Sequence, residues 1–237
     1  MPNESIFKPD PLPGFSCRDL VIIPADVPSR LIQKTLRQCA ASTQRMLFSR
    51  LFYFKSHAVL YGGIGAPAVT LVLEPLLVSG IQRIIFLGLA GSLTSRLAVK
   101  SAAVIDSALS EEGTSRHYFP DKHVFSSSPQ LSSRIESLLE RQQLPFTRAS
   151  AVSTDAPYRE TPDWIARQTA QGCELVDMEI SAVFALSEYY GVQAAALMLV
   201  SDRLWGSRHQ KHFHHLNGSI RSYFYPFIKN QENHDAP

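Results

Sequence analysis

The chain has 237 residues, of which 45% are hydrophobic and 19% are charged, and its formal net charge is +2 at neutral pH. This composition excludes a disordered chain, and the balanced charge gives no electrostatic reason to expect binding to nucleic acid or to a membrane surface. Three cysteines without a CxxC pair argue against a secreted disulfide framework, and no apolar run approaches the roughly 20 residues that span a bilayer, so we expect a cytoplasmic protein.

Strand and helix signals alternate along the chain. Short β-branched runs predict strands, and apolar residues that recur every three to four positions predict helices. Pro75 predicts a kink or an early end in its helix, because proline cannot donate the helical hydrogen bond. In chain order the predicted elements are an irregular arm over residues 1–18, a strand over 19–24, a helix over 29–43, one or two strands over 50–60, a glycine turn over 62–65, a helix over 66–79, strands over 83–87 and 102–106, a helix over 127–143, a strand over 146–152, a helix over 162–171, a strand over 175–176, a helix over 180–190, a strand over 194–200 and a frayed tail over 230–237.

This alternation predicts one α/β domain over residues 19–229, in which a mixed, mainly parallel central sheet lies between two layers of helices. In such three-layer α/β/α folds, ligands bind in the loops beyond the carboxyl ends of the strands. Three strand-to-loop junctions are therefore candidate site segments, namely residues 62–65, 88–92 and 201–202.

Two segments place acidic residues where a predicted strand ends. Asp177 and Glu179 precede the helix over 180–190, so they either cap that helix or bind sugar hydroxyl groups. Asp202 follows the strand over 194–200, where an aspartate is either a turn residue or a general acid. Spacing alone leaves these alternatives open.

Four stretches together resemble the type I nucleoside phosphorylases, a family of purine nucleoside and uridine phosphorylases and related nucleosidases. The signature is VDMEISAVFALSEYYGVQAAALMLVSD, at residues 176–202. LVIIPADVPSR is similar to the first strand and phosphate loop, YGGIGAPAVTLVLEPLLVSGIQRIIFLGLAGSL to the glycine turn, helix, strand and second glycine turn, and AVSTDAPYRET to the base-site segment. The resemblance covers about residues 19–205, and the joint order of the motifs makes it specific.

The resemblance implies an enzyme that cleaves an N-glycosidic bond. Glu179 matches the glutamate that binds ribose hydroxyl groups, and its charge would stabilise the cationic sugar of the transition state. Asp177 would make a second hydroxyl or orienting contact, while Met178 and Ile64 would pack on the ribose. Asp202 matches the aspartate that protonates or hydrogen-bonds the leaving purine, so burial should help it to hold a proton.

The base is expected near Pro157 and Tyr158, and Arg159 would either hydrogen-bond a base carbonyl or pair with Glu160. Asp202 favours a purine, whereas the base-site segment has the form found in some uridine phosphorylases. The resemblance therefore leaves the base open, with a purine favoured.

The acceptor site departs from the family pattern. Phosphorylases bind phosphate with a glycine-rich first loop and arginines, but here Ala25 replaces the glycine, Phe86 replaces a strand arginine and Leu89 replaces a hydroxyl donor. Related nucleosidases activate water with a glutamate in the first loop, where this chain offers only the nearby Asp26. The candidate phosphate or water site comprises Ala25, Asp26, Arg30, Arg45, Gly88 and Ser92. The resemblance implies that a neighbouring subunit supplies one arginine, either Arg45 or Arg50.

We expect phosphorolysis of a nucleoside to free base and ribose 1-phosphate, with phosphate as co-substrate and no cofactor, by a homodimer or a hexamer built as a trimer of dimers. The alternatives are a phosphate-independent nucleosidase and a nucleoside-binding sensor that has lost catalysis. The histidine-rich segment over 209–215 is interpreted as part of a lid that carries Arg208, and no metal is expected because consecutive histidines point in different directions.

Overall fold

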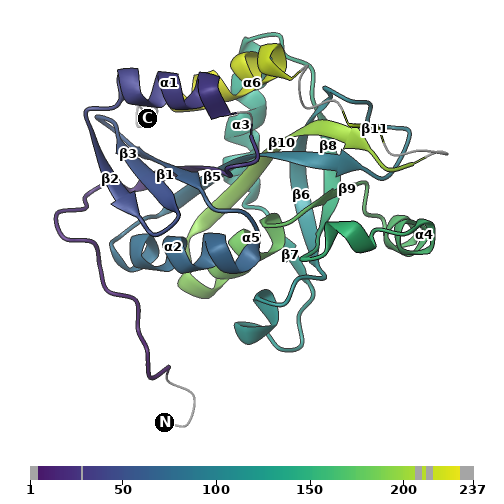
Figure 1. Ribbon diagram of the computed structural model, residues 1–237, viewed down its shortest axis with the longest axis horizontal. Coiled ribbons are helices and arrows are strands. Elements are labelled where there is room, and N and C mark those ends of the chain that lie inside the picture. Colours follow the sequence, from purple (N-terminus) through teal and green to yellow (C-terminus); the bar gives the residue numbers. More distant parts are fainter. Residues whose placement is uncertain (1–4, 28, 206–209, 212–215, 230–237) are drawn as a thin grey trace.

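The computed structural model describes residues 5–27, 29–205, 210–211 and 216–229 (Figure 1). The strands are β1 (Asp19–Ile23), β2 (Ser42–Met46), β3 (Ser49–Tyr53), β4 (Ala58–Gly62), β5 (Arg83–Ser92), β6 (Ala102–Ser110), β7 (Val124–Ser126), β8 (Thr147–Ser153), β9 (Leu175–Asp177), β10 (Gln193–Arg203) and β11 (Gln210–Lys211). The helices are α1 (Ser29–Cys39), α2 (Ala66–Val78), α3 (Pro129–Arg141), α4 (Pro162–Ala170), α5 (Ile180–Tyr190) and α6 (Asn217–Lys229), with 3-10 turns η1 (Ser115–His117) and η2 (Pro157–Arg159).

All the described strands belong to one sheet, in the order β11-β10-β6-β8-β9-β5-β1-β4-β3-β2, with β7 paired to β6. Strand β10 also pairs with β5, so β5, β10, β6, β8 and β9 close into a barrel-like ring, and β1, β4, β3 and β2 extend from it. The expected alternation of strands and helices is confirmed.

The expectation of a mainly parallel sheet is wrong, because six of the eleven pairings are antiparallel. Two of these six arise because short turns join β2 to β3 and β3 to β4, and a short turn can only connect antiparallel neighbours. Another is the pairing of β9 with β5, which helps to close the ring.

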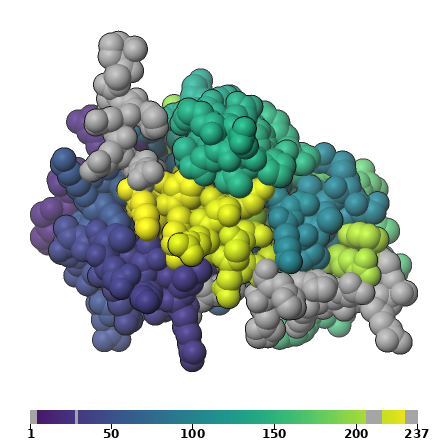
Figure 2. Space-filling model, turned by 90° about the horizontal axis from the view of Figure 1, so that it is seen from above, coloured from purple at the N-terminus to yellow at the C-terminus, as the bar shows by residue number. Residues whose placement is uncertain are grey.

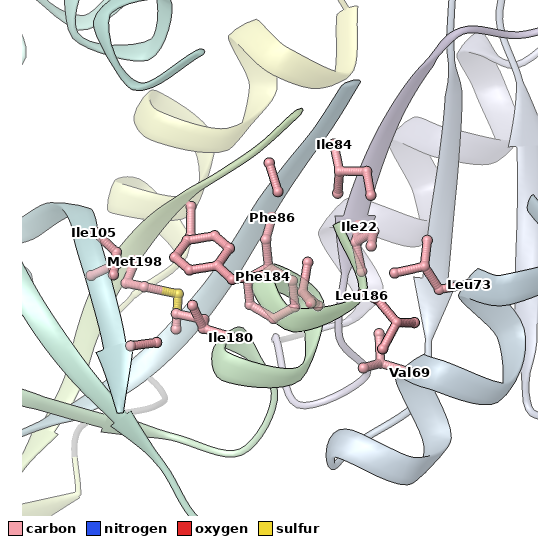
Figure 3. Packing of buried hydrophobic residues seen from close by; sticks show 14 of the residues in the cluster. Ile22, Val69, Leu73, Ile84, Phe86, Ile105, Ile180, Phe184, Leu186 and Met198 are labelled. Atoms are coloured by element: carbon pink, nitrogen blue, oxygen red, sulfur yellow. The ribbon is translucent and has the colours of Figure 1, made fainter. Parts of the chain in front are cut away.

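Helices cover both faces of the sheet (Figure 1). On one face, α2 and α5 pack over an apolar cluster that contains Phe86 and Met198 (Figure 3). On the other face, α1, α3 and α6 cover a cluster that contains Leu87 and Leu197, and Figure 2 shows α6 between α1 and α3. Adjacent residues fall in opposite clusters because side chains alternate along a strand. None of the described helices is both long and apolar enough to cross a membrane.

Several element boundaries differ from the sequence-based expectation. Helix α2 continues through Pro75 without ending there, and the Ser79 amide donates to the Pro75 carbonyl at 3.2 Å. Residues 88–92 and 201–202 lie inside β5 and β10 and not in loops, because these two strands pair along almost their whole length. Strand β2 and helix α6 were not predicted.

Candidate active site

Asp177 organises the junction between β9 and α5. Its Oδ2 accepts hydrogen bonds from the amides of Glu179 at 2.9 Å and Ile180 at 2.7 Å. Its Oδ1 accepts a hydrogen bond from Ser153 Oγ at 2.6 Å, and Ser153 Oγ in turn accepts one from the Ser181 amide at 2.9 Å. Both oxygens of Asp177 therefore accept hydrogen bonds that hold the start of α5 in place. Of the two alternatives for Asp177, these contacts match helix capping.

A second buried carboxylate braces the same turn from the other side. The Ser181 hydroxyl donates to Glu112 Oε1 at 3.0 Å, and Glu112 also accepts hydrogen bonds from the hydroxyl of Ser110 and the amide of Ser115. These donors hold the pKa of Glu112 below its usual value, although burial opposes them. Glu112 was not singled out from the sequence, because its partners lie on separate elements.

Glu179 is buried and points to the glycine turn before α2. Its Oε1 accepts a hydrogen bond from the Gly65 amide at 2.6 Å. Gly65 has φ 88°, a left-handed conformation that a residue with a side chain adopts only with strain. Ile64, just before it, is exposed, as a residue that packs against a ligand would be. Met178 is half-buried beside Glu179.

The first loop lies against the same glycine turn. The Ala25 amide donates to the Gly63 carbonyl at 3.1 Å, which brings Asp26 toward Glu179. Asp26 is open to solvent, but surrounding protein atoms partly desolvate its carboxyl group. This desolvation, together with the charge of Asp177, raises the pKa of Asp26 to about 6.

Three acidic groups therefore crowd the end of the site that the resemblance assigns to the sugar. Burial raises the pKa of Asp177 to about 6, against the hydrogen bonds from Ser153 and two backbone amides that favour its charged form. Burial, and then the charges of Asp177 and Asp26, raise the pKa of Glu179 well above its usual value. Such a group of acids stabilises positive charge that develops beside it.

Asp202 lies at the same end of the sheet as Glu179. Gly91 of β5 pairs with Val176 of β9 on one side and with Asp202 of β10 on the other. Asp202 is buried, its Oδ1 accepts a hydrogen bond from Ser201 Oγ at 2.6 Å, and its Oδ2 lies 3.6 Å from where a Cβ on Gly91 would be. Asp202 and Val176, which precedes Glu179 by three residues, thus pair with the same residue of β5.

The expected base-site residues form the turn η2, at the surface. Tyr158 is 96% exposed, and Pro157 and Arg159 are also exposed. Glu160 is half-buried, and burial and then the charge of Asp202 raise its pKa to about 7. Sequence reasoning treated Glu160 only as a partner for Arg159 and so missed its relation to Asp202.

The strand β5 residues of the expected acceptor site face the protein interior. Phe86 is 0% exposed and packs in the cluster with Met198, and a Cβ on Gly88 would lie 2.6 Å from the Phe86 ring (Figure 3). Ser92 is buried, and its hydroxyl donates to the Thr94 carbonyl at 2.7 Å. An aromatic ring therefore fills the space beside Gly88 where related phosphorylases are expected to place an arginine.

Cations near the expected acceptor site are exposed. Arg30 lies in the first turn of α1, and Arg45 and Arg50 are direct cross-strand partners on the hairpin of β2 and β3. Like charges placed opposite each other destabilise a sheet unless an anion or an acidic group lies between them. Leu47 and Phe48 at the tip of this hairpin are 65% and 56% exposed. Arg208 and the histidine-rich segment lie outside the described residues, apart from residues 210–211.

A cavity of about 590 Å³ lies at the amino ends of β1 and β5, the opposite end from Glu179 and Asp202. Its one acidic lining residue, Asp19, is ion-paired with Arg83. We place the candidate active site at the carboxyl ends of these strands, because the acids gather there.

Comparison with known proteins finds a matching family profile and similar relatives. Residues 33–219 match the sequence profile of the phosphorylase superfamily. The chain is 25% identical over 194 residues to a DeoD-type purine nucleoside phosphorylase of Brevibacillus brevis, which covers 78% of this chain and 82% of that protein.

Solved structures share the fold. Purine nucleoside phosphorylase from Toxoplasma gondii in complex with immucillin-H has a TM-score of 0.68 at 19% identity, covering 79% of this chain and 78% of that one. The 5'-methylthioadenosine/S-adenosylhomocysteine nucleosidase from Helicobacter pylori has a TM-score of 0.73 at 17% identity, covering 90% of this chain and 97% of that one.

Proposed function

Because the chain belongs to the phosphorylase superfamily, we propose that it cleaves the N-glycosidic bond of a purine nucleoside, with inorganic phosphate as the acceptor. The bond from C1′ to the base breaks, a bond from C1′ to a phosphate oxygen forms, and the base leaves with a proton. The observation that carries this proposal is that Val176, three residues before Glu179, and Asp202 pair with the same residue of β5, Gly91. Phosphorylases of this family use phosphate as co-substrate and need no resident cofactor.

Glu179 acts on the sugar. As the bond to the base lengthens, positive charge grows on the ribose ring, and a nearby carboxylate stabilises that charge more in the transition state than in the bound substrate. The Gly65 amide holds Oε1, so the carboxylate is oriented before the substrate arrives. Asp177 acts through Glu179 as a positioning residue, because its own oxygens are engaged by Ser153 and the start of α5.

Asp202 acts on the base. Negative charge grows on the purine as it leaves, and a proton or hydrogen bond from a carboxyl group at N7 stabilises it. The side chains of Leu204 and Val176 fill the space beside Gly91, next to Asp202 Oδ2.

Hydrolysis is the second candidate reaction, and two observations favour it. Phe86 occupies the position where a phosphate-binding arginine is expected. Because its side chain is fully buried in the apolar cluster, a small movement of this strand would not create a phosphate-binding site there. Asp26, with its pKa raised to about 6, lies near Glu179 and is a suitable general base for a water molecule.

Release of free base from adenosine, inosine and uridine, measured by chromatography with and without phosphate, tests the proposal. Phosphorolysis predicts release that depends on phosphate and yields ribose 1-phosphate. Release without phosphate, with ribose as the product, supports hydrolysis. Tight binding of a nucleoside without any release supports a sensor and contradicts both reactions.

We further propose that the chain works as an oligomer in which the β2–β3 hairpin contacts a second copy. Leu47 and Phe48 expose apolar surface at the hairpin tip, and the Phe48 carbonyl lies 2.8 Å from where a Cβ on Gly62 would be, so the tip lies beside the glycine turn. A contact there would bring Arg45 of one copy near the acceptor site of the other.

A further inference from the structure

Glu112 is a buried carboxylate that the proposed mechanism does not use. It is 5% exposed and lies in the loop between β6 and η1. Its two oxygens accept hydrogen bonds from the amide of Ser115, at 3.2 and 3.1 Å, and from the amide of Thr114. The Ser110 hydroxyl donates to Oε1 at 2.8 Å. These donors belong to the strand end and loop around Glu112, but one further donor lies on α5.

The donor on α5 is the Ser181 hydroxyl, 3.0 Å from Glu112 Oε1. Ser181 is fully buried in the first turn of α5, and it follows Glu179 by two residues. Glu179 is the residue at which α5 begins, and its carboxylate makes no capping hydrogen bond to its own helix. The direction of the Glu179 side chain therefore depends on how the first turn of α5 is held and on the Gly65 amide at its far end.

The start of α5 is already capped without Glu112. Asp177 Oδ2 accepts hydrogen bonds from two amides of this turn, and Ser153 Oγ accepts one from the Ser181 amide. The bond from the Ser181 hydroxyl to Glu112 is therefore not needed to cap the helix. It adds a fixed tie between this turn and the loop that follows β6.

The loop that carries Glu112 is itself fixed to elements other than α5. The Glu111 amide donates to the Ser153 carbonyl of β8 at 3.0 Å. The Gly113 amide donates to Asp155 Oδ2 at 2.8 Å, and the Glu111 carboxylate accepts hydrogen bonds from two side chains of α4. Glu112 is thus an acceptor on a firm support, and hydrogen bonds to a charged acceptor are stronger than those between neutral groups.

We propose that Glu112 is a positioning residue for the sugar end of the site: through Ser181 it holds the first turn of α5, and with it Glu179, in the orientation in which the Glu179 carboxylate meets the ribose. This inference rests on the proposed function, because it takes the ribose to be what Glu179 binds. A small displacement of an oriented group costs much of its effect on the transition state. Loss of the tie should therefore lower turnover and weaken binding of the sugar, while binding of the free base is kept.

The experiment compares the wild type with E112Q, S181A and the double variant. S181A is the more selective change, because it removes the donor on α5 and leaves the other bonds of Glu112 in place. The matched control is S187A, which removes another buried hydroxyl from the same helix, where it donates to the Val183 carbonyl at 2.7 Å.

Turnover and binding are measured separately. Steady-state kinetics with phosphate give kcat and KM for adenosine and inosine. Calorimetry gives dissociation constants for 9-deazaadenosine, which is not cleaved because carbon replaces N9, and for its free base, 9-deazaadenine. The ratio of these two constants isolates the contribution of the sugar to binding. Thermal melts establish the temperature range in which each variant is folded.

We expect E112Q and S181A each to lower kcat by about tenfold or more at temperatures where they are fully folded. The sugar contribution to binding should fall several-fold in the same two variants, while S187A stays close to the wild type in both measurements. Because Glu112 acts through Ser181, the double variant should lose no more than E112Q alone.

A merely structural role for Glu112 would lower the melting temperature and leave kcat and the sugar contribution unchanged, and that result would overturn the proposal. Losses that add up in the double variant would overturn it as well, because Glu112 would then act by another route. If E112Q does not fold, the comparison of S181A with S187A decides.

If the wild type cleaves no nucleoside, the proposed function fails, but binding still tests the role of Glu112. A sugar contribution that is present in the wild type and lost in E112Q and S181A then supports this role. A wild type that binds 9-deazaadenosine no more tightly than 9-deazaadenine, or binds neither, overturns it.

Discussion

Glu179 illustrates how a site residue can lower the stability of the protein that carries it. Its carboxyl group is buried beside Asp177 and near Asp26, and all three have raised pKa values. A carboxyl group whose pKa is raised on folding binds its proton more tightly in the folded state. Stability is therefore fully present below its ordinary pKa and is lost as pH rises through the raised value.

We therefore predict that Glu179→Gln stabilises the protein while it impairs turnover. The amide oxygen can still accept the hydrogen bond from Gly65, but the buried charge is gone. A gain of about 1 kcal/mol raises the melting temperature of a chain of this size by about 2–4 °C. Calorimetry should show a larger gain at pH 7.5 than at pH 5, where the wild-type carboxyl is more fully protonated. A variant that melts below the wild type at pH 7.5 would show that the buried charge of Glu179 does not destabilise the folded protein.

Asp202→Asn is expected to reduce kcat for a purine nucleoside by about 10²–10⁴-fold and to leave nucleoside binding largely intact. An amide keeps the shape of the side chain but cannot supply a proton to the leaving base. A riboside of p-nitrophenol, whose leaving group needs no proton, is the chemical control and should be cleaved nearly as well by the variant. Equal losses on both substrates would assign Asp202 a structural role.

The chemistry-bearing acids were predictable from local sequence, but their partners were not. Asp177, Glu179 and Asp202 stand at strand ends in a recognisable stretch. The charge of Asp202 helps to raise the pKa of Glu160, although the two residues are 42 positions apart in the chain. Glu112 accepts a hydrogen bond from Ser181, which is 69 positions away. No periodicity or spacing within the chain reports such contacts.

At the scale of elements, one serine side chain joins the start of α5 to the strand that precedes it. The Ser153 hydroxyl on β8 joins Asp177 to the Ser181 amide, so one side chain aligns two strands with the helix that follows Glu179. Removing it leaves a buried carboxylate oxygen and a buried amide with fewer partners.

We predict that Ser153→Ala lowers the free energy of unfolding by about 1–3 kcal/mol and also lowers kcat, because Glu179 loses its alignment. Urea denaturation and steady-state kinetics measure the two effects. Ser150→Ala on the same strand is the matched control, because the Ser150 hydroxyl is hydrogen-bonded to that of Ser107, at 3.1 Å. Comparable losses in both variants would show that any serine on β8 matters equally.

The elements that sequence reasoning located best are those with uniform local signals. Helix α5 has the predicted bounds, because an apolar run ends at Gly191, which has a left-handed φ of 68°. Strand β5 is longer than predicted because Gly88 and Gly91 resemble turn residues, whereas here they give room to Phe86 and Leu204. Strand β2 is polar and lies at the edge of the sheet, so it carries no hydrophobic alternation.

At the scale of the whole molecule, closure of the sheet brings the site together. Strand β5 pairs with β10 on one side and with β9 on the other, so residues more than 100 positions apart meet at Gly91. An open, mainly parallel sheet would not place β9 against β5. Ring closure depends on pairings between distant segments, which explains why the fold class was predictable and the closed ring was not.

The exposed β2–β3 hairpin allows the proposed assembly to be tested. If the apolar tip is buried against a second copy, replacing Leu47 and Phe48 together by serine should shift the protein toward its 26.4 kDa monomer. Sedimentation velocity over a range of concentrations measures this shift. Val124→Ser, at another exposed apolar residue, on β7, is the control and should leave the assembly unchanged.

The same contact links assembly to the choice of acceptor. If Arg45 crosses to the neighbouring copy and binds phosphate, Arg45→Ala in the intact oligomer should raise KM for phosphate about ten- to a hundredfold, the cost of losing one charge-assisted hydrogen bond. The double serine variant should show the same loss, because its monomers cannot exchange Arg45. A wild type that is monomeric at all concentrations, yet depends on phosphate, would contradict the shared site and point to cations of the same chain.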